Sequence, residues 1–205
     1  MKVTALIVFF TASLFSTTIL EWNAEDYQGI SSDDVKVIFF DDFTNSDKFW
    51  KKSDFKKTKT TIESGICELS AKGEQQIWQE LVMDKDGFEL EVSFKSGKPK
   101  SNDPLNVFVC GSRDKMLTFS IYPDQTYKAT LIEGDSKKDY ISKTPSASIK
   151  ATDNKITIRK VDETLYFFIN EVLMITRTFP SLSGYRYGFT TSKNDMIIDY
   201  FIMSD

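Results

Sequence analysis

The chain has 205 residues, of which 40% are hydrophobic and 14% aromatic, so it is long and apolar enough to bury one core of ordinary size. Acidic residues outnumber basic ones by 30 to 26, and the resulting net charge of -4 argues against a nucleic-acid partner. The sequence contains no histidine, which excludes a Ser-His-Asp or Cys-His catalytic apparatus and every histidine-ligated metal site.

An uncharged, mostly apolar segment follows Lys2 and extends from Val3 to Leu20. A positive residue before such a run is typical of a secretory signal peptide, so we expect the protein to be secreted or otherwise extracytoplasmic. The run is also just long enough to span a bilayer, so residues 1–20 form a signal peptide, an N-terminal anchor or a buried segment. A membrane is expected as a partner only if this segment stays uncleaved. Residues 21–34 are polar and are expected to be a linker.

From residue 35 onward, short apolar runs recur between Gly, Pro, Asn, Asp and Lys residues, and helical spacing is nearly absent. This pattern predicts an all-β domain over residues 35–205, built as an antiparallel β-sandwich. The expected strands are Lys36–Phe40, Ile66–Ala71, Gln76–Met83, Phe88–Lys95, Leu105–Cys110, Met116–Tyr122, Tyr127–Glu133, Lys155–Lys160, Leu165–Asn170, Leu173–Thr178, Tyr185–Thr191 and Met196–Met203.

The alternation within these runs predicts which strands have one face in the core. Apolar and polar residues alternate cleanly from Phe88 to Phe94, as a half-buried strand requires. The run from Leu165 to Ile169 is apolar on both faces, so this strand is expected to be central. Asn170 follows it and is expected to take a positive φ in a tight turn. The lysine-rich segment Lys51–Lys59 is interpreted as a solvated loop or an edge strand.

Several blocks of the sequence resemble the concanavalin A-like lectin and glucanase superfamily. They are Ile38–Phe43 with Trp50, Asn154–Lys160 with Leu165–Asn170, Gly184–Phe189, and Asp199–Phe201. The resemblance covers nearly all of the chain after the linker. It implies a jelly-roll fold in which the first and last strands are neighbours, and it includes lectins, laminin G-like modules, glucanases and keto-disaccharide hydrolase-like domains. A shared fold of this kind supports the architecture more strongly than any activity.

Glucanases of this superfamily carry alternating carboxylates on one strand, and the nearest match here is Glu89-Leu90-Glu91-Val92-Ser93. Glu89 and Glu91 would share a face at about 6.5 Å along the strand, a spacing compatible with a two-carboxylate mechanism. The third carboxylate is replaced by Ser93, and two exposed glutamates lack the asymmetry between acid and partner that the mechanism needs. We therefore predict no catalytic residues, with a glycoside-processing enzyme that uses this pair as the alternative.

Aromatic side chains that could serve as stacking platforms, together with one arginine, are the candidates for ligand contact. The predicted ligand-binding residues are Trp78, Tyr166, Tyr185, Arg186 and Tyr187. The sequence thus predicts a secreted, non-catalytic binding module whose ligand is a carbohydrate or a protein surface. No cofactor is expected.

Two pairs of residues have more than one interpretation. Asp41 and Asp42 are potential calcium ligands, as in some lectin and laminin G-like relatives, or they satisfy the amides of a turn near Phe43; we predict no metal site. Cys67 and Cys110 either form a disulfide in an oxidising compartment or are two separate buried hydrophobic residues.

Overall fold

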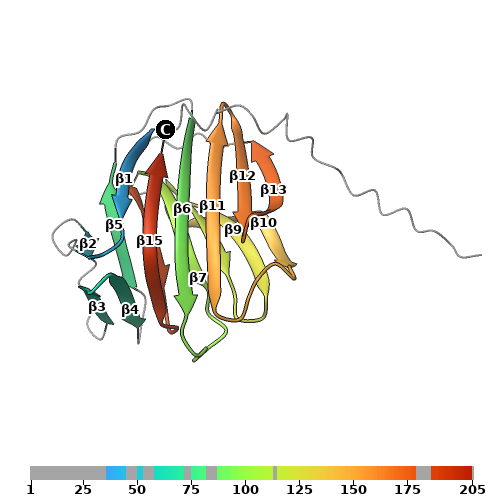
Figure 1. Ribbon diagram of the computed structural model, residues 1–205. Coiled ribbons are helices and arrows are strands. Elements are labelled where there is room, and N and C mark those ends of the chain that lie inside the picture. Colours follow the sequence, from blue (N-terminus) through green and yellow to red (C-terminus); the bar gives the residue numbers. More distant parts are fainter. Residues whose placement is uncertain are drawn as a thin grey trace, which may run out of the picture.

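A computed structural model describes residues 36–44, 50–52, 58–71, 75–81, 87–112, 115–178 and 186–204. Within these ranges the chain forms two antiparallel β-sheets packed face to face, with sheet A in front of sheet B in Figure 1. The described part contains no helix, and therefore none that is long and apolar enough to cross a membrane. The predicted N-terminal segment and linker lie outside these residues.

Sheet A has the strand order β13-β12-β11-β6-β15-β4-β3, and β1 also pairs with β15. Its strands are β1 (Val37–Asp41), β3 (Thr58–Glu63), β4 (Ile66–Ala71), β6 (Gly87–Ser96), β11 (Asp153–Val161), β12 (Thr164–Ile169), β13 (Val172–Thr178) and β15 (Met196–Ser204).

Sheet B has the strand order β10-β9-β8-β7-β14-β5-β2. Its strands are β2 (Lys51–Lys52), β5 (Gln75–Glu80), β7 (Leu105–Ser112), β8 (Lys115–Ile121), β9 (Thr126–Glu133), β10 (Ser136–Pro145) and β14 (Arg186–Thr191). The all-β sandwich predicted from the sequence is confirmed.

The first and last strands lie side by side, as the resemblance implied. β1 runs antiparallel to the C-terminal half of β15, with Val37 opposite Ser204 and Asp41 opposite Phe201. Both ends of the described domain therefore lie at the same end of sheet A, beside the C-terminus marked in Figure 1.

The core lies between the inner faces of the sheets, and β6 contributes every second residue to it. Phe88, Leu90, Val92 and Phe94 are buried, and the residues between them are half-buried on the outer face, so the predicted alternation is confirmed. At the turn after β12, Asn170 has a φ of 51°, as predicted.

An aromatic cluster around Trp50 joins the two sheets near β1. The indole ring stacks on Phe189 of β14 at 5.3 Å between ring centres and meets Phe201 of β15 edge-on at 5.4 Å. Its Nε1 donates a 2.7 Å hydrogen bond to Oδ2 of Asp41, while Oδ1 of Asp41 accepts one from the backbone amide of Phe43. Asp41 thus caps the turn that follows β1, which is the second of the two interpretations of this residue.

Three strands, β2, β3 and β10, are absent from the sequence-based list. β2 lies in the lysine-rich segment Lys51–Lys59 and β3 begins in it, and these two are edge strands of sheet B and sheet A, respectively. β10 is the other edge of sheet B. Most of β10 is exposed and polar, so it shows no apolar alternation. The β12 strand is not central, because only β13 separates it from the edge of sheet A. Phe168, on the outer face of β12, is nevertheless only 7% exposed.

Cys67 lies on β4 and is fully buried in the core. Cys110 lies on β7 of the opposite sheet, but its side chain is outside the described part of the structure. Both interpretations of this pair, a disulfide and two separate buried hydrophobic residues, therefore stay predictions.

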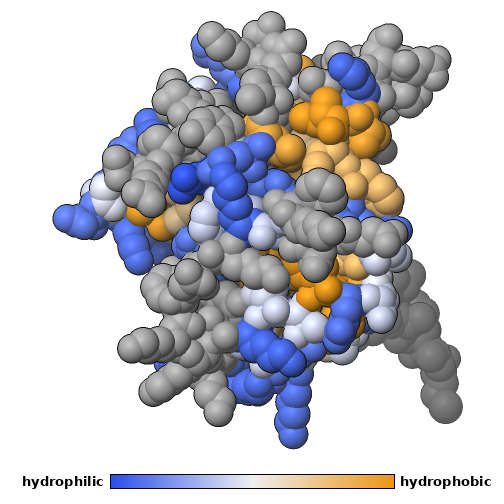
Figure 2. Space-filling model, turned by 90° about the vertical axis from the view of Figure 1, so that its left-hand side faces the viewer, coloured by the Kyte–Doolittle hydropathy of each residue, from blue (hydrophilic) through white to orange (hydrophobic). Residues whose placement is uncertain are grey.

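Large hydrophobic side chains reach the surface at few described positions. Val37 and Phe40 of β1 and Val172 of β13 are about half exposed. Figure 2 views the side of the molecule that carries β1, β2, β3 and β5, where hydrophobic surface forms separate patches among hydrophilic side chains.

Candidate functional site

The outer face of sheet B brings together two of the predicted ligand-binding residues, Trp78 and Arg186. Trp78 lies on β5 and Arg186 on the neighbouring strand β14, and the guanidinium carbon is 5.5 Å from the centre of the indole ring. A cation at this distance is attracted to the face of the ring. The indole Nε1 is buried, and the interaction of Trp78 with Glu80 contributes to lowering the pKa of that carboxyl.

Arg186 is held in place by an acidic neighbour on β5. Its Nη2 lies 3.2 Å from Oε1 of Glu80, which also forms an ion pair with Lys51 of β2. The hydrogen bond from Lys51 lowers the pKa of Glu80 below its ordinary value, and the charge of Arg186 adds to this effect. The guanidinium is thus anchored by a carboxylate and lies over the indole ring.

Trp78 belongs to a row of residues that project outward from adjacent strands, which we call the aromatic row. In register from the edge of sheet B, it contains Lys51, Trp78, Gly188, Phe108 and Thr118. Neighbouring strands lie about 4.8 Å apart, so the backbones that carry the two aromatic residues are separated by roughly 10 Å across the glycine. Phe108 is only 3% exposed and Gly188 is buried, so the accessible aromatic surface of this row belongs to Trp78.

Tight packing of β14 against β5 requires a glycine at position 188. A Cβ atom at this position would lie 2.0 Å from the carbonyl oxygen of Ile77 and 2.8 Å from the Cα of Trp78. These atoms are backbone and cannot swing aside as a flexible side chain would. Glycine is therefore required here, and its missing side chain separates Trp78 from Phe108.

A second outward-facing row lies beside the aromatic row and supplies amide and hydroxyl groups. It contains Gln76, Thr190, Asn106 and Ser120 in register. The Ser120 hydroxyl donates to Oδ1 of Asn106 at 2.6 Å, and Nδ2 of Asn106 donates to the carbonyl oxygen of Thr190 at 3.3 Å. We call this the polar row. Small-ligand sites are typically lined by aromatic side chains together with a few polar groups in fixed positions.

Two of the other predicted ligand-binding residues are described by the structure, and both lie away from the outer face of sheet B. Tyr187 is buried in the core, only 4% exposed, and its ring meets Phe88 edge-on at 6.1 Å, so it does not reach the surface of sheet B. Tyr166 is half-buried on β12 of sheet A, on the opposite side of the sandwich from Trp78. Tyr185 lies outside the described residues.

A groove of about 440 Å³ opens on the outer face of sheet A, and we call it the sheet A groove. It is lined by Glu89, Glu91, Thr157, Arg159, Phe168, Glu171, Val172 and Leu173. The two glutamates expected to be exposed are only 24% and 20% exposed at their side chains, because they lie in this groove between neighbouring strands.

Each of the two glutamates in the sheet A groove has its own cation. Arg159 of β11 hydrogen-bonds and ion-pairs with Glu89, and Nζ of Lys155 lies 3.0 Å from Oε2 of Glu91. The Tyr200 hydroxyl donates to the other oxygen of Glu91 at 2.7 Å. Glycoside hydrolysis needs one protonated acid beside one ionised partner, whereas each of these carboxylates is paired with a cation.

Ionisation of the Tyr200 hydroxyl is expected to make the free energy of unfolding depend on pH in the alkaline range. Burial, and then the hydrogen bond to Glu91, raise the pKa of Tyr200 from 10.0 to about 12. Because the folded pKa is the higher one, this contribution is complete below about pH 10 and is lost as the pH rises toward 12. Urea titrations between about pH 9 and about pH 11.5 measure the free energy of unfolding. We expect it to fall less steeply with rising pH in Tyr200→Phe than in the wild type. Equal slopes in the two proteins would contradict the assignment.

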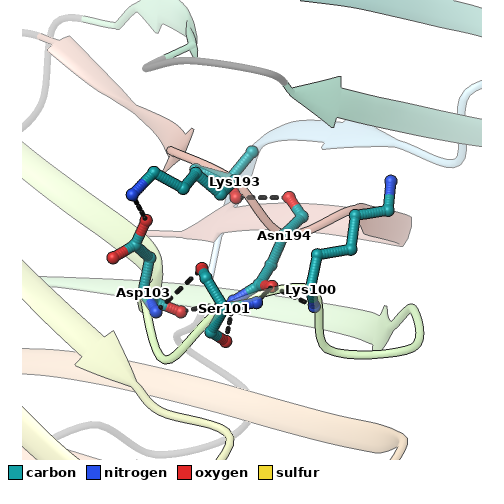
Figure 3. A network of polar contacts seen from close by, with 6 residues as sticks. Lys100, Ser101, Asp103, Lys193 and Asn194 are labelled. Carbon is teal, nitrogen blue, oxygen red and sulfur yellow. Dashed lines mark hydrogen bonds and ion pairs between the residues drawn. The ribbon is translucent and has the colours of Figure 1, made fainter.

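A further cavity, of about 360 Å³, lies at the end of the sandwich where the loops after β6, β8, β10 and β14 meet. Asn194 fixes one of these loops, as Figure 3 shows. Its Oδ1 accepts hydrogen bonds from the amides of Lys100 (2.8 Å) and Ser101 (3.0 Å), and its Nδ2 donates to the carbonyls of Ser101 (3.1 Å) and Asp103 (2.5 Å). The cavity is thus bordered by a loop of defined conformation.

No protein-family model matches this sequence, and no curated protein is significantly similar to it. Solved structures are similar in fold. The CBM2 module of the Lactobacillus casei BL23 phage J-1 evolved Dit superposes with a TM-score of 0.63 at 10% identity, covering 83% of this chain and 95% of that one. A Bacillus licheniformis β-glucanase gives 0.59 at 12% identity, covering 80% and 96%. The carbohydrate-binding module CBM66 from Bacillus subtilis gives 0.59 at 10% identity, covering 73% and 91%. The chain therefore has the concanavalin A-like jelly-roll fold.

Proposed function

We propose that this protein is a secreted, non-catalytic carbohydrate-binding module and that it binds its ligand on the aromatic row of sheet B. The observation that carries the proposal is the half-buried indole of Trp78 on the outer face of sheet B, with the Arg186 guanidinium carbon 5.5 Å from its ring centre and the polar row beside it. A sugar ring presents an apolar C–H face to an aromatic ring and its hydroxyls to polar groups at the rim. The polar row and the Glu80–Arg186 pair supply such groups.

The solved structures of this fold support a carbohydrate in preference to a protein surface as the ligand. They include two carbohydrate-binding modules and the carbohydrate recognition domain of Emp47p. A non-catalytic role is favoured because the glutamates with glucanase-like spacing, Glu89 and Glu91, lie on the opposite sheet and are each paired with a cation. Export is supported by the uncharged segment after Lys2.

Removing the indole ring is expected to weaken carbohydrate binding strongly without unfolding the protein. A glycan array on the purified domain identifies the ligand, and calorimetric titration then compares wild type with Trp78→Ala. We expect the affinity to fall by about 30-fold or more, because a central aromatic anchor commonly contributes about 2 kcal/mol or more to binding.

The matched control is Phe40→Ala, which removes an aromatic ring that is 56% exposed on β1 of the other sheet. This variant is expected to bind as the wild type does. The proposal is wrong if the wild-type domain binds no glycan, or if Trp78→Ala and Phe40→Ala bind equally well. Unfolding midpoints of both variants show whether a loss of binding reflects a loss of structure.

A further inference from the structure

We propose that the sheet A groove is a second binding site, which takes one ring of a neutral, hydroxyl-rich ligand such as a monosaccharide unit. The groove lies on the opposite side of the sandwich from the aromatic row. Its volume of about 440 Å³ is in the range of small-ligand pockets. The inference stands on residues of β6, β11, β12 and β13 and does not depend on Trp78.

The strongest sign of a missing ligand is the hydroxyl of Thr157. This residue lies on β11 and lines the groove, yet it is only 6% exposed, and its Oγ1 has no hydrogen-bond partner among the described residues. Buried hydroxyls are normally paired, because desolvation without a partner is unfavourable. A ligand hydroxyl can both donate to and accept from Thr157, so it would satisfy this group completely.

The charges of the groove favour an uncharged ligand. Arg159 is paired with Glu89, and Lys155 bridges Glu91 and Glu171. Burial alone would lower the pKa of Lys155, but its hydrogen bonds to the two glutamates raise it overall, so this cation stays charged with its partners. A charged ligand would have to displace one member of these pairs, whereas ligand hydroxyl groups can donate to the carboxylates or accept from the cations while the ion pairs stay in place.

The other wall of the groove is apolar. Phe168, Val172 and Leu173 line it, and Val172 is 49% exposed although it is a large aliphatic residue. A groove with paired charges on one side and apolar carbon on the other matches the two kinds of surface of a pyranose ring. With the aromatic row on the other sheet, a single domain would then present two sugar sites on opposite faces.

The test uses the purified domain and nuclear magnetic resonance of its backbone amides. The probes are D-glucose, D-galactose, D-mannose, L-fucose and N-acetyl-D-glucosamine, with acetate and ethylammonium as charged comparisons. We expect at least one sugar to shift the amides of Thr157 and Val172 at concentrations up to about 100 mM. The same shifts are expected in Trp78→Ala, so that failure of the sheet B site and failure of this one are distinguished.

The decisive variant is Thr157→Val, which has nearly the same shape and removes only the hydroxyl. Because that hydroxyl is unpaired, we expect an unchanged or higher melting temperature together with an affinity at least about 10-fold weaker. Thr176→Val, on the same face but outside the groove lining, and Thr157→Ser, which keeps the hydroxyl, are expected to bind as the wild type does. Equal binding by Thr157→Val, stronger binding of a charged probe, or no shift with any sugar would overturn the inference.

Discussion

Replacing Trp50 by alanine is expected to lower the free energy of unfolding by about 3–5 kcal/mol, the range for a buried large aromatic residue. The ring is 4% exposed and lies within 6.2 Å, between ring centres, of four phenylalanines on elements of both sheets. Its removal leaves a cavity between the sheets and takes the Nε1 donor away from the buried carboxylate of Asp41. Urea titration followed by circular dichroism measures the change.

The variant Trp50→Phe separates the ring from its hydrogen bond. It keeps much of the aromatic packing but removes the 2.7 Å bond to Asp41, so the expected loss is about 1–3 kcal/mol. Equal losses in the two variants would show that the hydrogen bond dominates. A loss under about 1 kcal/mol in Trp50→Ala would contradict the role of this residue in joining the sheets.

Replacing Asn194 by alanine is expected to cost about 2–4 kcal/mol of unfolding free energy. The side chain is 3% exposed and makes all four of its hydrogen bonds to the backbone between Lys100 and Asp103. Without it, backbone groups of the β6–β7 loop lose their partners and must be rehydrated. Thermal and urea unfolding measure the loss.

Asn102 provides a control within the same loop, because it is exposed and of the same residue type. The change Asn102→Ala is expected to alter the stability by no more than about 0.5 kcal/mol. Asn194→Asp keeps the acceptor oxygen but loses the Nδ2 donor, so its stability should lie below the wild type. If Asn194→Ala were as stable as Asn102→Ala, the loop would not depend on this amide.

The fold was predictable where one face of a strand is buried, since burial imposes a two-residue period on the sequence. Phe88–Phe94 shows this period, and the matching patterns at the two ends of the domain correctly placed β1 beside β15. Edge strands lack the signal. β10 contributes Ile141 to the core but is otherwise mostly exposed and polar, so its sequence is not distinguishable from that of a loop.

The position of β12 shows a second limit of periodicity. Apolar residues on both faces indicate that both faces are covered, but they do not say by what. Here the outer face contributes Phe168 to the wall of the sheet A groove, so the strand is covered without being central.

The candidate site was only partly predictable for a related reason. Alternation places Gln76, Trp78 and Glu80 on one face of a strand, which is a local property of the sequence. Pairing Trp78 with Arg186, which is more than a hundred residues away, depends on strand order in sheet B. Tyr187 shows the same limit. Alternation places it on the face of its strand opposite to Arg186, but it does not say which of the two faces is turned toward the core, and in the structure Tyr187 is buried there.

The antiparallel pairing of β1 with β15 also determines how the domain would respond to a pulling force. Val37 and Ser204 lie opposite each other, so tension between the two ends would load the ladder hydrogen bonds one pair at a time, in the manner of a zipper. Such a ladder yields at lower force than one in which all the bonds are sheared together. The first strand to peel away would be β1, and its departure would uncover the Trp50 cluster while leaving both proposed sugar surfaces, on other strands, in place.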